Sequence, residues 1–246
     1  MSAREAAAAN FREYMRQSNE LHDTYLDEPG AADQYDRFAE WQMAYLLTFF
    51  TDLHERPGYE EAIDFAMTDL AGARVSGRDR ELERASPIVT RMLPRKALET
   101  IAAAAELNAR VLEVNLGIFR FLQIDGELPD EISDHDYYVA CRDASSLDEY
   151  IELVHLATYL GGTLKTLVKV PLLGAMLRGM RGPAHVAGFG VLQEFLEDGY
   201  TKFREVPDID HFLSEIDGRM TEVFELIYTK PLSVEDPPHR YCNQTQ

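Results

Sequence analysis

The sequence predicts an all-α fold, a single-domain multi-helix bundle, on the basis of periodicity and composition. Apolar residues recur at intervals of three and four along nearly the whole chain, and no stretch shows the strict alternation typical of a half-buried strand. With 46% hydrophobic and 27% charged residues, the composition is that of an ordinary globular protein. A chain of 246 residues is long enough to bury a sizeable core within one domain.

Apolar stripes locate the first core helices. One stripe runs from Phe38 to Leu53 and ends before Pro57, and a second runs from Leu98 to Phe119. Ser146 and Glu149 have the spacing of a capping box, in which the hydroxyl and the carboxylate reciprocally satisfy backbone amides. A further helix is therefore expected to begin near Ser146.

Two more helices close the predicted fold, one from Phe189 to Phe203 and one from Ile209 to Ile227, with Pro207 between them. No interior linker is rich enough in Gly, Ser or Pro to separate two domains, so residues 1–230 are predicted to form one helical domain. The remaining residues, 231–246, lose the periodicity and gain proline. They are predicted to form a flexible tail.

The charge balance restricts partners and location. Because 43 Asp and Glu residues oppose 24 Lys and Arg residues, the net charge of -19 repels phosphate backbones and argues against nucleic acid as the main partner. The charged N-terminus lacks the apolar core of a signal peptide, and no uncharged apolar run reaches the ~18 residues of a membrane span. Cys141 and Cys242 have no metal-binding spacing and suit a reducing compartment. We expect a cytoplasmic protein that can lie on the inner membrane but does not cross it.

One segment departs from this acidic character. No Asp or Glu occurs from Leu153 to Gln193, where the average frequency in the chain predicts about seven. Pro171 is expected to divide the segment, because a proline inside a helix removes a backbone hydrogen bond and clashes with the preceding turn. We therefore predict a proline-kinked basic helical hairpin over residues 157–186, in which each helix has one apolar and one cationic face.

This hairpin is the predicted binding surface, and three interpretations of it are open. Its apolar faces could belong to the core, with the cations against acidic helices of the same protein. It could bind an acidic protein partner or an anionic membrane, which requires apolar anchors flanked by cations. It could also gate a cavity for an apolar ligand whose carboxylate or phosphate meets a cation. The residues concerned are Lys165, Lys169, Met176, Arg178, Met180 and Arg181.

A metal- or haem-dependent helical-bundle enzyme is the alternative function. Glu152 and His155 form an ExxH pair, which places a carboxylate and an imidazole on one helix face as di-iron bundles require, although the chain has no second ExxH. His155 and His185 lie among apolar residues and are the candidate haem ligands, without a CxxCH motif nearby. No cofactor is predicted for the favoured function, which is non-catalytic binding.

A run of alternating charge between residues 78 and 84 has two interpretations, an active-site network or a structural one. Its spacing is typical of an exterior helix face with salt bridges, and we favour the structural role. If part of the run is buried, an Arg to carboxylate pair is expected to fix the helix packing, because an unpaired buried charge is costly. The members are Arg78, Asp79, Arg80, Glu83 and Arg84.

The segment from Arg78 to Ala109, with the upstream run FFTDLH, resembles the bacterial family named for its FFLEELY motif. The resemblance continues through KVPLLGAMLRGMRGPAHVAG and FLEDGYTKF and covers most of the chain. The double Phe is kept, whereas Thr51 and His54 stand where the motif has an apolar residue and a tyrosine. Since that family has no assigned activity, the resemblance implies an uncharacterised helical bacterial protein and supplies no catalytic residues.

Overall fold

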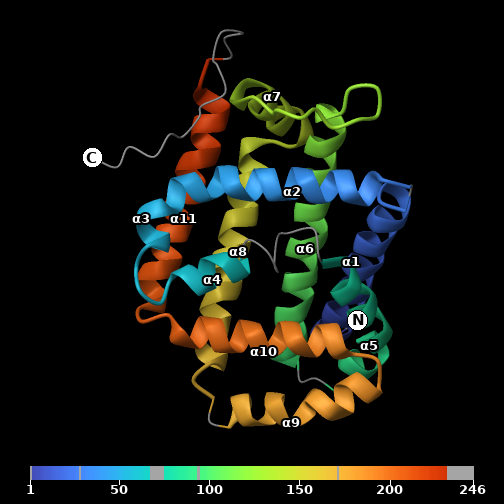
Figure 1. Cartoon of the computed structure of the whole chain (residues 1–246). Helices are drawn as coiled ribbons and strands as arrows, with labels where there is room; N and C mark the ends of the chain where they lie inside the picture. Colours follow the sequence, from blue (N-terminus) through green and yellow to red (C-terminus); the bar gives the residue numbers. More distant parts are fainter. Residues whose placement is uncertain (1, 28, 67–74, 93–94, 171, 232–246) are drawn as a thin grey trace.

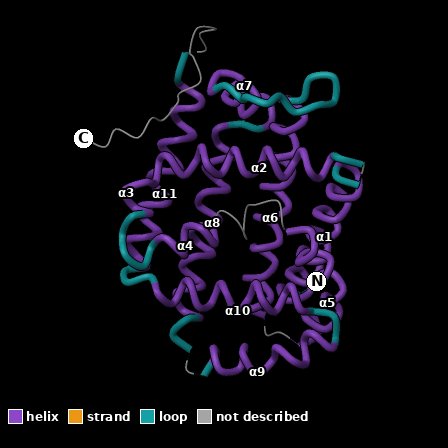
Figure 2. The backbone as a smooth tube through the Cα atoms, viewed as in Figure 1, coloured by secondary structure: helices purple, strands orange, loops and turns teal. Residues whose placement is uncertain are grey.

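Helices dominate the computed structural model, as the periodicity predicts, and Figure 2 shows them joined by short loops. Among the described residues no strand is present, and the only bridge of the β type joins Ile124 to Glu127. The all-α prediction is confirmed. The described residues are 2–27, 29–66, 75–92, 95–170 and 172–231, without the side chains of residues 75–78, 88, 89 and 92.

The N-terminal helix α1 (Ala3–Tyr25) packs along the long central helix α6 (Arg95–Leu122), as Figure 1 shows. A complete capping box of Ser2 and Glu5 begins α1. Phe11 is completely buried against α6, where Ala102 and Ala105 contribute small side chains to the same apolar cluster. Small residues on α6 let the two helix backbones approach closely, so α1 covers one side of the central helix.

Helix α2 (Ala31–Leu47) crosses the central helices in Figure 1 and contributes aromatic side chains to the largest core cluster. The rings of Tyr35 and Phe38 lie 5.5 and 5.9 Å from the ring of Phe119 on α6. The apolar stripe that we predicted up to Leu53 is not one regular helix: it continues through a 3-10 turn (Thr48–Phe50) into the short α3 (Thr51–His54). The hydroxyl of Thr48 donates to the Tyr45 carbonyl at 2.6 Å where the geometry changes.

Three helices complete this core: α7 (Asp134–Ala144), α8 (Leu147–Leu167) and α11 (Ile209–Thr229). Helix α8 begins where we predicted, because the Ser146 hydroxyl accepts a hydrogen bond from the Glu149 amide at 3.2 Å. The capping box is incomplete, however. The Glu149 carboxylate accepts a hydrogen bond of 2.5 Å from the Ser145 hydroxyl, and this contact takes the place of the predicted reciprocal bond.

A second layer at the other end of the molecule carries the candidate site. It consists of α4 (Glu60–Phe65), α5 (Val75–Met92), α9 (Leu173–Val186) and α10 (Gly190–Glu205). Helix α10 contacts α4, α5 and α8 and supports α9 on its remaining side. Glycine makes one of these contacts possible: a Cβ atom on Gly199 would lie 2.7 Å from the ring of Phe65. The layer therefore places α9 at the edge of the molecule.

The acid-free segment folds as two helices, α8 up to Leu167 and α9 from Leu173. Pro171 lies outside the described residues, so the kink at that residue stays a prediction, as does the flexible tail, of which residues 232–246 are also outside. A turn joins the end of α9 to the start of α10, and Gly188 in this turn has a φ of 76°. The turn lets α10 pack against α9. Within the described ranges, no helix is long and apolar enough to cross a bilayer.

Candidate functional site

The outer face of α9 exposes large apolar side chains. Leu172, which precedes the helix, is 81% exposed, and Met176 and Met180 are 61% and 49% exposed. Their spacing of four residues places them in one stripe along the helix. Of the residues of α9, Gly174 and Ala184 are buried. The interpretation that both apolar faces of the hairpin belong to the core is therefore wrong for α9.

Intramolecular ion pairs hold two of the four predicted cations. The Lys165 ammonium lies 2.5 Å from the carboxylate of Asp210. Arg181 donates two hydrogen bonds to Glu197, of 2.6 and 2.8 Å, and these bonds lower the pKa of the Glu197 carboxyl group.

Lys169 and Arg178 behave differently from these two. Neither forms a hydrogen bond or an ion pair with another residue that the structure describes. The basic face of the segment is thus divided. Half of its charge is neutralised within the protein, as the first interpretation requires, and half remains available to another molecule.

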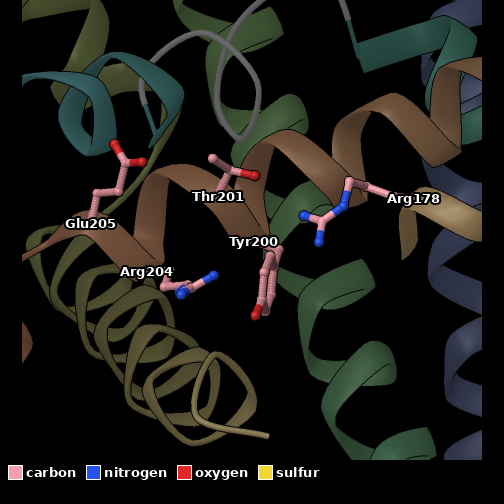
Figure 3. A pocket seen from close by; sticks show the side chains of 5 residues that line it. All are labelled: Arg178, Tyr200, Thr201, Arg204 and Glu205. Atoms are coloured by element: carbon pink, nitrogen blue, oxygen red, sulfur yellow. The ribbon is translucent and has the colours of Figure 1, made fainter. Parts of the chain in front are cut away.

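A pocket of about 390 Å³ is lined by residues of α9 and α10 (Figure 3). Arg178 comes from α9, and the other described lining residues come from α10. In Figure 3 the guanidinium groups of Arg178 and Arg204 point toward Tyr200 from either side. The lining residues are Arg178, Tyr200, Thr201, Arg204 and Glu205.

Close packing between the two helices fixes this pocket. A Cβ atom on the buried Gly174 would lie 2.6 Å from Cε1 of Tyr200, so the tyrosine ring rests directly on the backbone of α9. The Thr201 hydroxyl donates to the Glu197 carbonyl at 2.9 Å and is already engaged within α10. Sequence reasoning identified Arg178 but missed the α10 residues, because no local pattern reports that Gly174 receives the ring of Tyr200.

The predicted metal or haem ligands do not converge. Glu152 accepts a hydrogen bond of 3.0 Å from Arg110. The Nε2 atom of His155 lies 4.0 Å from an Asp217 oxygen, and His155 is mostly exposed. His185, also exposed, lies 3.5 Å from a carboxylate of α10. Within the described part of the chain, these three residues belong to no group of three potential metal ligands.

One such group occurs elsewhere among the described residues, and sequence reasoning did not identify it. The turn at Pro57 and Gly58 brings α3 and α4 together, so that ligand atoms of His54, Glu60 and Asp64 lie within 4.8 Å of one another. The two carboxylates are exposed, and His54 is paired with Asp64 at 2.8 Å. The three residues have no regular spacing in the sequence, so no local pattern predicts the group. In the structure it is a histidine paired with a carboxylate at the surface.

The run of alternating charge on α5 has one deeply buried member. Asp79 is 1% exposed and accepts a hydrogen bond of 2.7 Å from the Asn108 amide of α6. The same amide nitrogen donates to the hydroxyl of Ser18 on α1 at 2.8 Å. His22, 2% exposed, lies 4.0 Å from the Asp79 carboxylate. This polar cluster joins α1, α5 and α6 in the interior of the protein.

The other members of the run connect α5 to its neighbours. Arg80 lies at the surface, 3.3 Å from Asp23 of α1. Arg84 donates to the Gly188 carbonyl at 2.5 Å, in the turn that precedes α10. The side chain of Arg78 lies outside the described residues. These contacts suit the structural role that we favour for the run, which stays a prediction.

The thiol of Cys141 is expected to be unreactive in the folded protein. Cys141 is completely buried, and burial raises its pKa to about 12, so the reactive thiolate is scarce at neutral pH. In a variant carrying Cys242→Ser, a maleimide at pH 8 should label no thiol in native buffer and one equivalent in denaturant. Mass spectrometry checks this result. Stoichiometric labelling within minutes in native buffer would contradict it.

Comparisons with known proteins identify a family and nothing more specific. No curated protein and no solved structure matches the chain. A family model matches residues 21–232, which include every helix described above except most of α1. Its members have no assigned activity, as the sequence resemblance also implied. The chain belongs to the family described as a domain of unknown function, DUF8198.

Proposed function

We propose that the chain is a non-catalytic interaction protein whose outer α9 face binds an acidic, amphipathic helix of a protein partner. We further propose a cytoplasmic bacterial protein of the FFLEELY-motif family, with one helical domain over residues 1–230. The observation that carries the proposed activity is the exposed apolar stripe of Leu172, Met176 and Met180. A row of large apolar side chains left in water is typical of an interaction site.

The composition of the stripe suits a helical partner. Methionine side chains are flexible and polarizable, so Met176 and Met180 can adapt to the side chains of another helix. A Cβ atom added to Gly179 would meet nothing within 4 Å, so the backbone beside the stripe is open to close approach. An apolar helix face with anchors spaced by three or four residues is the complement that such a surface binds.

Charge supports an acidic protein segment over an anionic membrane. Lys169 precedes the stripe without an ion-pair partner among the described residues, whereas Arg178 faces α10, and one cation contributes only about 1 kcal/mol at an anionic surface. The carboxylates of Glu194 and Asp198 on the adjacent α10, and the net charge of -19, repel an extended anionic surface. A short acidic helix would contact α9 alone, so only the charges near α9 have to complement it.

The test measures binding of a synthetic amphipathic peptide with leucines at intervals of three and four and glutamates at both flanks. Fluorescence anisotropy should show saturable binding to the full chain. The double variant Met176→Glu, Met180→Glu should bind at least about tenfold more weakly, because it loses two apolar anchors and gains repulsion. Tyr159→Glu is the control, since Tyr159 is 63% exposed on α8 and gains one glutamate charge outside α9, compared with two in the double variant.

Three outcomes count against the proposal. The first is unchanged peptide binding by the double variant, with helical content verified by circular dichroism. The second is equal binding of a peptide whose glutamates are replaced by lysines, which would remove the role of charge. The third is binding to vesicles rich in phosphatidylglycerol without binding to the acidic peptide, which would assign the face to a membrane.

A further inference from the structure

We infer that the pocket between α9 and α10 is a binding site for a phosphate monoester, held by Arg178 and Arg204 with the hydroxyl of Tyr200. This site is separate from the apolar stripe, which faces outward from α9. The inference rests on the donors that line the pocket, on the packing that positions them and on the local charge. It does not depend on the protein partner proposed above.

The donors are the first argument. Arg178 and Arg204 line the same pocket, and within the described residues neither forms a hydrogen bond or an ion pair. Tyr200, between them in Figure 3, also forms no side-chain hydrogen bond to a described residue. Each guanidinium presents a planar set of N–H donors that matches two oxygens of a phosphate at once. The arrangement therefore offers more donors than a single carboxylate can use.

The packing of the helices positions these donors. Arg178 follows Gly174 by one helical turn, and Arg204 follows Tyr200 by one turn, so each arginine projects near the contact between that glycine and that tyrosine. The Tyr200 ring lies against the α9 backbone and sets the separation of the helices there. A site that is built on two packed helices keeps its geometry better than one on loops.

Local charge is the third argument. The carboxylate of Glu197 is bound to Arg181 through two hydrogen bonds; the charge of Arg178 also lowers the pKa of Glu197, but Arg178 forms no hydrogen bond with it, so its N–H donors stay available to a ligand. Glu205 also lines the pocket, but in Figure 3 its side chain points to the opposite side of α10 from Arg204 and Tyr200. Two cations facing one side thus favour a dianion, within a protein whose overall charge is strongly negative.

The size of the pocket indicates the class of ligand. A volume of about 390 Å³ holds on the order of ten water-sized groups, which exceeds what one inorganic phosphate fills. The ligand is therefore expected to carry an organic group on its phosphate. Either a soluble phosphate monoester or the headgroup of phosphatidic acid has this chemistry, and the experiment distinguishes these two sources.

Calorimetric titration of the full chain with phenyl phosphate tests the inference. One saturable site is expected, and Arg178→Gln and Arg204→Gln should each weaken binding about tenfold or more, because each removes charged hydrogen bonds to the phosphate. Arg178→Lys should bind with intermediate affinity, since it keeps the charge but loses the planar donors. Glu205→Gln should strengthen binding, because it removes the one carboxylate among the described lining residues.

Lys169→Gln is the matched control, because it removes the same charge from the same acid-free segment at a residue outside the described pocket lining. Its affinity should stay within about twofold of the parent protein, since exposed charges at a distance are screened by salt. The double variant Met176→Glu, Met180→Glu should still bind with one saturable site, which separates failure of this inference from failure of the proposed function.

The sources are distinguished by sedimentation with vesicles that contain phosphatidic acid. Vesicle binding that requires Arg178 and Arg204 would support the pocket and assign the lipid as its source, whereas binding of phenyl phosphate alone would assign a soluble ligand. Absence of saturable binding to both probes would overturn the inference. Equal losses in Arg178→Gln and Lys169→Gln would also overturn it, because they would show general charge attraction in place of a site.

Discussion

Replacing Phe38 with alanine is expected to lower the free energy of unfolding by about 3–5 kcal/mol. The ring is completely buried, and its centroid lies 6.0 Å from that of Tyr35 and 5.9 Å from that of Phe119. The substitution removes the transfer free energy of the ring and leaves a cavity between α2 and α6, which rigid helices refill only in part. Urea denaturation, followed by circular dichroism, measures the loss.

Phe121→Ala is the matched control for this prediction. Phe121 has the same side chain but is 45% exposed at the end of α6, so its removal should change the free energy of unfolding by less than about 1 kcal/mol. Similar losses in the two variants would contradict the position of α2 over the core.

Asn108→Ala is expected to lower the free energy of unfolding by about 3 kcal/mol. The amide nitrogen of Asn108 donates to the buried carboxylate of Asp79 and to the hydroxyl of Ser18. Removing it withdraws a hydrogen-bond donor from a charge that water does not reach, and such losses are larger than that of a hydrogen bond between neutral groups. Asn10→Ala, on the exposed side of α1, should cost less than about 0.5 kcal/mol.

A double-mutant cycle isolates the contact between these two residues. The variants Asp79→Leu, Asn108→Leu and their combination should be non-additive, because removing both polar partners costs less than the sum of the single losses. Additive losses would show that Asn108 and Asp79 do not interact in the folded protein.

The helices that sequence periodicity locates best are those whose apolar stripe is continuous and covered. The stripe from Leu98 to Phe119 predicts α6 to within a few residues, and Pro207 marks the boundary between α10 and α11 as expected. Local spacing also predicts the start of α8 at Ser146. These features are encoded by residues close in the chain, which is why periodicity and capping residues are sufficient.

The parts that sequence reasoning could not predict depend on distant residues. Periodicity shows that α9 has apolar residues but does not show which of them α10 covers, so the exposure of Met176 was not predictable. A charge run in the sequence is usually solvated, yet Asp79 is buried because Asn108 approaches it from another helix. Likewise, Arg181 and Arg178 look equivalent in the sequence, and only the position of Glu197 distinguishes them.

The cluster around Asp79 also bears on where the folding unit begins. The family match starts at residue 21 and contains Asp79 and Asn108, but Ser18 lies before it. Phe11 and Met15, which cover α6, lie before it as well. A protein cut at the start of the match would expose the alanine face of α6 to water and leave the interior amide of Asn108 without its hydroxyl acceptor. We therefore expect the unit that folds to be longer than the unit that the family model recognises, and we propose a domain boundary for expression ahead of α1.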